Sequence, residues 1–95
     1  MIPGGDPVRL LLRALRHSAA AGGVAPTLTH EEQTPWASAT FTGAQHRVAV
    51  EGGGIDGWLA ALPEIELDLR GHLVASCDVL PTRNGAVLTV LVLEA

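Results

Sequence analysis

The stretch 65-IELDLRGHLVASCDV-79 decides the fold, because apolar or very small side chains occupy all of its odd positions. The even positions are polar except at Val74. Successive side chains of a β-strand point to opposite faces, so this alternation predicts a strand with one buried face. Fifteen extended residues would span about 50 Å, whereas a domain of this length has a radius of gyration of about 13 Å. We therefore expect a long strand that bends near Gly71, since a glycine inside a strand marks a kink or bulge.

Two other segments have the spacing of amphipathic helices. Residues 7–20 start at Asp6-Pro7, a favourable cap followed by a favourable first helical residue, and end before Gly22-Gly23. Residues 55–62 carry apolar side chains at positions i, i+3, i+4 and i+7 and stop at Pro63. The sequence thus predicts one longer and one short helix.

The remaining segments predict two hairpins. Residues 24–34 are expected to form a connector, followed by strands over 36–42 and 45–51 with Gly43 between them. Asn84-Gly85 is a strong turn signal between the long strand and a last strand over 86–93.

The length of the second turn sets the register of the last hairpin. A two-residue loop at Asn84 and Gly85 places Val79 opposite Val90 and Cys77 opposite Val92. A three-residue loop would instead move the side chains of the last strand to the other face of the sheet.

The order of these elements is αββαββ. It predicts one α+β domain over residues 1–95, with two layers and a four-stranded, mainly antiparallel sheet whose long third strand is bent near Gly71. The last strand is apolar on both faces, whereas two short helices cover only one face. The second cover is either a helix that crosses over or another copy of the chain, and we expect a homodimer. The expected interface residues are Val74, Leu80, Val87, Leu91 and Leu93.

The amino-acid composition limits the classes to which this protein can belong. Hydrophobic residues make up 47% of the chain, but it has only two tryptophans and one phenylalanine, so the core must be small and aliphatic. No apolar run is long enough for a membrane span, and the chain lacks the pattern of a secretory signal. A single cysteine cannot form an internal disulfide, which favours a reducing, cytoplasmic location.

A pocket is the main alternative to a protein interface. Trp36, His46 and Trp58 are the expected lining of a small-ligand or enzymatic site near the loop 52–57. That loop matches G-x-G-x-x-G, but Asp56 places a negative charge where a phosphate would bind, and the following helix is short. We therefore interpret the loop as a flexible connector and predict no bound cofactor.

No set of side chains has the spacing of a metal site or a catalytic nucleophile, so we predict neither. The histidines lack a second ligand at a suitable distance along the chain, and Glu64, Glu66 and Asp68 fit the solvated side of a half-buried strand. Proximity of His46 or His72 to one of these carboxylates would require a strand order that the sequence does not give.

A basic stripe on the first predicted helix is the remaining candidate. Arg9, Arg13 and Arg16 share one helix face with His17. Residues 24–95 carry three arginines and nine acidic residues, and this charge of −6 opposes nucleic acid, which we regard as an improbable partner. The sequence therefore predicts a homodimeric interaction or regulatory module without catalytic activity, with ligand binding and nucleic-acid regulation as alternatives.

Overall fold

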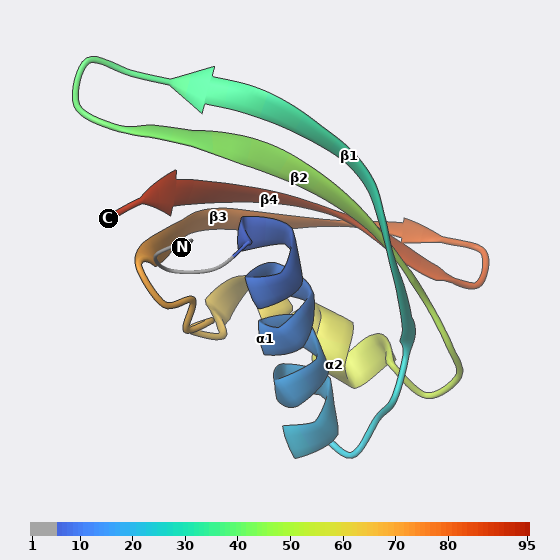
Figure 1. Ribbon diagram of the computed structural model, residues 1–95. Coiled ribbons are helices and arrows are strands. Elements are labelled where there is room, and N and C mark those ends of the chain that lie inside the picture. The colour runs from blue at the N-terminus through green and yellow to red at the C-terminus, as the bar shows by residue number, and fades with distance from the viewer. Residues whose placement is uncertain (1–5) are drawn as a thin grey trace.

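The computed structural model describes residues 6–95 and has two layers, with two helices on one face of a four-stranded antiparallel sheet (Figure 1). The strands follow the order β1-β2-β4-β3 across the sheet. The predicted fold class is confirmed. The elements are α1 (Pro7–Ala21), β1 (Thr27–Ala37), β2 (Thr42–Glu51), α2 (Asp56–Ala61), a 3-10 turn η1 (Leu62–Glu64), β3 (His72–Thr82) and β4 (Gly85–Glu94).

Helix α1 begins and ends where the sequence predicts. The side chain of Asp6 accepts a hydrogen bond of 3.0 Å from the backbone N–H of Val8, which satisfies one of the unpaired donors of the first turn. At the other end the N–H of Gly22 bonds to the carbonyl oxygens of Ser18 and Ala19. The buried residues Leu11, Leu15 and Ala19 follow the helical period and face the sheet.

The first hairpin differs from the prediction. The expected connector over 24–34 is wrong, because β1 already starts at Thr27, and the hairpin does not turn at Gly43. The turn lies at residues 38–41, where the hydroxyl of Ser38 accepts hydrogen bonds from the N–H groups of Thr40 and Phe41. Most side chains of β1 are exposed, so this edge strand lacks the apolar alternation by which a strand is recognised.

The long alternating stretch divides at Gly71. The chain turns there, with Gly71 at a φ of +76° and a bridge between Leu69 and His72. The arm over 65–70 lies outside the sheet, yet Leu69 is buried and its alternate neighbours pack against the core. The alternation of apolar and polar residues therefore reflects burial on one side in both arms, but only the arm after Gly71 pairs with another strand.

The predicted register of the β3–β4 hairpin is wrong by two residues. The loop consists of Arg83 and Asn84, and Thr82 pairs with Gly85, so that Val79 lies opposite Leu88 and Cys77 opposite Val90. An ideal Cβ at Gly85 would lie 1.9 Å from the carbonyl oxygen of Val50. The glycine is thus needed within the ladder, where β2 approaches closely, and not in the turn.

A bulge in β3 changes which side chains face the helices. The register shifts between Val74 and Ser76, so the side chains before and after Ala75 alternate in opposite phase. As a result Val74 packs against the core together with Cys77 and Val79. This bulge has no counterpart in the sequence pattern.

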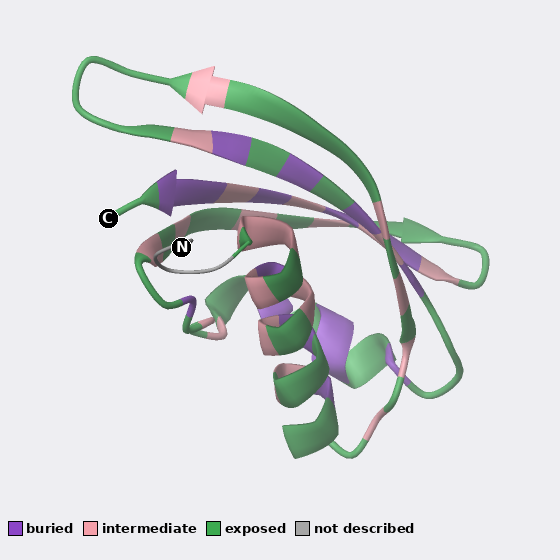
Figure 2. Ribbon diagram, in the orientation of Figure 1, coloured by how far each residue is buried: buried purple, intermediate pink, exposed green. Residues whose placement is uncertain are grey.

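We call the side of the sheet that carries α1 and α2 the helix face, and the other side the open face. The core lies between the helix face and the helices, and burial alternates along β2 and β4 (Figure 2). Its strand residues include Val48, Val50, Leu88, Val90 and Val92. The described residues of the open face on β3 and β4 are Leu73, Ser76, Asp78, Leu80, Val87, Thr89, Leu91 and Leu93.

Candidate functional site

The open face carries more aliphatic side chains on β3 and β4 than on β1 and β2. On β3, Leu80 is 67% exposed and Leu73 is 50% exposed. On the adjacent β4, Val87 and Leu91 are half-buried, and their register places Leu80 beside Val87 and Leu73 beside Leu93. The half formed by β3 and β4 therefore presents aliphatic side chains to solvent at both ends of the strands, with Ser76, Asp78 and Thr89 between them.

The half formed by β1 and β2 is polar. Glu32 and Arg47 lie opposite each other and form an ion pair in which both side chains are about half exposed. An exposed pair of this kind contributes at most about 1 kcal/mol to stability. The open face thus combines aliphatic and polar side chains, as protein interfaces do.

Four of the five predicted interface residues lie on the open face. These are Leu80, Val87, Leu91 and Leu93, of which Leu93 is already buried within one chain, at 5% exposure. The prediction for the fifth residue, Val74, is wrong, because the bulge turns its side chain to the helix face and the core. For the same reason Leu73 belongs to the open face, although the regular alternation assigns it to the core.

The three residues of the predicted pocket are not brought together. Trp36 lies in register with Gly43 and Leu93 on the open face, whereas His46 and Trp58 are buried on the helix side. The indole Nε1–H of Trp58 donates a hydrogen bond of 2.9 Å to the hydroxyl of Ser18, which fixes α2 against α1. The pocket as predicted therefore does not exist.

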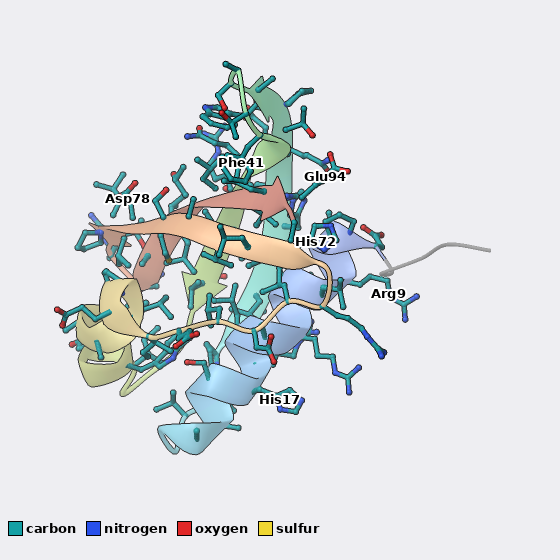
Figure 3. The ribbon with its side chains drawn as sticks, turned by 90° about the vertical axis from the view of Figure 1, so that its left-hand side faces the viewer. Arg9, His17, Phe41, His72, Asp78 and Glu94 are labelled. Carbon is teal, nitrogen blue, oxygen red and sulfur yellow. The ribbon has the colours of Figure 1, made fainter. Side chains whose placement is uncertain are left out.

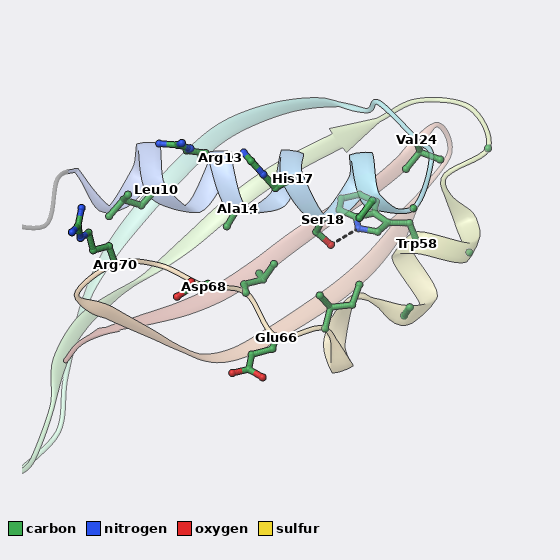
Figure 4. Close-up of a pocket in the computed structure, with 17 residues that line it drawn as sticks. Leu10, Arg13, Ala14, His17, Ser18, Val24, Trp58, Glu66, Asp68 and Arg70 are labelled. Carbon is green, nitrogen blue, oxygen red and sulfur yellow. Dashed lines mark hydrogen bonds between the residues drawn. The ribbon is translucent and has the colours of Figure 1, made fainter.

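A different groove contains Trp58. It runs between α1, α2 and the arm over 65–70, and has a volume of about 1020 Å³ (Figure 4). Its lining includes Leu10, Ala14 and Leu67, with charged side chains at its edges. The charged and titratable lining residues are Arg13, His17, Glu66, Asp68 and Arg70.

The loop 52–57 reaches two depressions but has no structure suited to a phosphate. Gly54 and Gly57 contribute to the groove beside Trp58, and Gly52, Gly53 and Asp56 line a second depression. Helix α2, which follows the loop, has only six residues. A helix this short provides a small dipole for binding an anion.

The predicted acidic and histidine positions are distributed over several surfaces. Glu66 and Asp68 line the groove, and His72 places its Nδ1 3.0 Å from the carbonyl oxygen of Arg70. The partner of His46 is not a carboxylate but His30, whose Nε2 lies 3.0 Å from the His46 Nδ1. Within residues 6–95, no group of three or more His, Cys, Asp or Glu side chains is placed to hold a metal ion.

Cys77 is half-buried on the helix face. Burial, with a further contribution from Asp78, raises the pKa of its thiol to about 11. Because the thiolate is the nucleophilic form, this thiol is unreactive at neutral pH. The residue serves as a small apolar side chain in the core.

The basic stripe of α1 is exposed. Arg9, Arg13 and Arg16 lie together with Asp6 around a shallow depression on the helix. In Figure 3, Arg9 and His17 extend away from the sheet. No helix in the part of the chain that the structure describes is long and apolar enough to cross a membrane.

Comparison with known proteins assigns this two-layer α+β chain to no family. Neither a protein-family model, nor a curated protein, nor a solved structure matches the chain. Functional inference therefore rests on the geometry of the open face, the groove and the buried histidine pair.

Proposed function

We propose that the protein acts as a homodimeric interaction or regulatory module, without catalytic activity, and that two copies pair through their open faces. The observation that carries the proposal is the exposure of large aliphatic side chains on a sheet face that neither helix covers. Leu80 and Leu73 are 67% and 50% exposed there. Exposed aliphatic side chains on an uncovered sheet face are typical of protein interfaces.

A second copy suits this face in shape and size. An apolar patch is complementary to itself, which is the requirement of a two-fold contact. The molecule has extents of 38 × 23 × 22 Å, and a stable interface buries roughly 800 Å² per partner. Two such sheets would pack as the layers of a sandwich, about 10 Å apart.

The edges of the sheet favour face-to-face contact over pairing of edge strands. The edge strand β1 has a bulge after His30 and a proline at position 35. The other edge strand, β3, has a bulge after Val74 and a proline at position 81. Bulges and prolines both disfavour addition of a further strand.

Sedimentation equilibrium of the full chain tests the proposal. We expect the wild type to have the mass of two chains at roughly 50 µM. Leu80→Asp should raise the dissociation constant by about tenfold or more, because a carboxylate would replace the most exposed leucine of the open face. Phe41→Asp is the matched control, since Phe41 is also exposed but lies in the β1–β2 turn. A single-chain mass for the wild type, or an unchanged dissociation constant in Leu80→Asp, would contradict the proposal.

The cellular location forms part of the proposal. We assign the protein to the cytoplasm because its one cysteine is unpaired and half-buried, which suits a reducing compartment. Fractionation of the native host that recovered the protein outside the cytoplasm would overturn this assignment.

Ligand binding in the groove is the second candidate function. Its volume of about 1020 Å³ is at the upper end of the usual range for small-molecule sites. Its apolar floor and its charges of both signs fit an amphipathic small molecule. We expect anilinonaphthalene sulfonate to quench Trp58 in a Trp36→Phe background, and Ala14→Phe to abolish quenching by filling the groove, whereas quenching that persists in Ala14→Phe would exclude this site.

A further inference from the structure

His46 is the one buried polar residue among residues 6–95, with 1% of its surface exposed. Its Nδ1 lies 3.0 Å from the Nε2 of His30, a half-buried residue of β1. The ring centroids are 5.2 Å apart and the ring planes meet at 63°. A hydrogen bond between two ring nitrogens requires that one carries the proton and the other a lone pair.

The pair lies where the β1–β2 ladder is irregular. His30 pairs with Val48 and Gln33 pairs with His46, and the register shifts between His30 and Glu32. A bulge leaves one residue without its regular ladder partner. The side-chain bond between the histidines therefore crosses from β1 to β2 beside the weakest part of that ladder.

We propose that the His30–His46 pair is a proton-sensitive clasp that fastens the middle of edge strand β1 to β2 at neutral pH and loosens it in acid. One additional proton is tolerated, because a singly protonated pair still has one N–H facing one lone pair. A second proton places two N–H groups and two positive charges in contact. Local opening of β1 relieves this repulsion and gives His46 access to water.

Taken together, the groups around His46 disfavour binding of the second proton. Burial lowers the pKa of His46, the positive charge of His30 lowers it further, Asp6 opposes these effects and His72 adds to them weakly. Glu94 and His72 line the same small cavity as His46, of about 260 Å³, and the Glu94 carboxylate accepts a hydrogen bond from Thr42. These groups approach from the start of α1, from β1, from β3 and from β4.

The sign of the pH effect follows from this lowered pKa. The unfolded chain binds the proton at the ordinary histidine value of 6.5, whereas the closed clasp resists it. The stabilising effect of the neutral His46 is therefore complete when the pH is above the pKa of the unfolded chain. It is lost as the pH falls from that pKa to the lower pKa of the folded state. The clasp loosens in weak acid.

Amide hydrogen exchange by NMR, on the full chain between about pH 7.5 and pH 5, tests the clasp. We expect β1 protection to fall several-fold relative to β4 as the pH decreases. The amides introduced by His30→Gln and His46→Asn each keep a hydrogen-bonding group near the original nitrogen but do not titrate. In His46→Asn, β1 protection should therefore stay constant relative to β4. In His30→Gln its pH dependence should be reduced, because His46 is still buried but no longer faces a second positive charge. His17→Gln is the matched control, because His17 is exposed on α1, and it should behave as the wild type.

Two results would overturn the proposal. One is wild-type β1 protection that changes with pH no more than that of β4. The other is an unchanged wild-type pH profile in His30→Gln, which decides the question even if His46→Asn fails to fold, because His30 is only half-buried.

Discussion

The helix face and the open face of the same sheet differ in burial far more than in hydrophobicity. On β4, Leu88 and Val90 of the helix face are completely buried, whereas Val87 and Leu91 of the open face are half-buried. Both rows of β4 are aliphatic except at Thr89, so the alternation of the strand alone does not say which row forms the core. The packing of α1 and α2 makes that distinction, and it leaves aliphatic side chains on the open face that the fold of one chain does not use.

The largest expected effect on stability comes from shortening a leucine to alanine, and it should differ between the two faces of the sheet. Leu88→Ala should reduce the free energy of unfolding by about 2–5 kcal/mol, because it leaves a cavity among fully buried neighbours. Leu80→Ala should change it by no more than about 0.5 kcal/mol in the monomer. Urea unfolding at a concentration too low for association measures both, and similar losses in the two variants would remove the distinction between the faces.

The close approach of β2 and β4 gives the next effect. Gly85→Ala should lower the free energy of unfolding by roughly 1–3 kcal/mol, since its Cβ would meet the Val50 carbonyl oxygen at 1.9 Å and force the strands apart. Gly53→Ala is the matched control, because a Cβ there has nothing within 4 Å. Thermal unfolding of the two variants should differ clearly, and equal melting temperatures would show that the ladder is looser than described.

Loss of the N-terminal cap of α1 should have a smaller effect on stability. Asp6→Ala should cost about 1 kcal/mol of unfolding free energy, because the first turn of α1 loses its side-chain acceptor. Asp78→Ala on the open face removes the same charge without a cap and should be nearly neutral. Chemical denaturation of both variants distinguishes capping from a general effect of charge, and equal losses would argue against the cap.

The smallest expected effect concerns the polar half of the open face. Arg47→Gln removes the ion pair with Glu32 and should lower the free energy of unfolding by less than about 1 kcal/mol, because both side chains are about half exposed. The loss should shrink in high salt, since exposed charges are screened. A larger loss that is independent of salt would indicate that these charges take part in packing.

The sequence predicted those parts of the fold that depend on local chemistry. The cap at Asp6 and the helical spacing of Leu11 and Leu15 located α1, and the length argument located the turn at Gly71. Strand β1 was missed because its solvent-exposed edge position imposes no apolar alternation. Local signals do not reveal which strands lie beside it in the sheet.

The candidate sites were harder to predict because they depend on contacts between distant residues. The bulge at Ala75 exchanges Val74 and Leu73 between the two faces, and nothing in the alternating pattern marks it. The contact between His30 and His46 joins two strands whose pairing was unknown. By contrast, Leu80 and Leu91 share a face as predicted, because a pairing error of two residues leaves each side chain on the same face.

Intermolecular NOEs between isotope-labelled and unlabelled chains would show directly whether the open faces of two copies pair. We predict cross-peaks from the methyl groups of Leu80, Val87 and Leu91 of one copy to the same row of the other. These should disappear on dilution. Absence of intermolecular cross-peaks at concentrations near 1 mM, well above the dissociation constants of specific dimers, or cross-peaks confined to α1, would contradict the account.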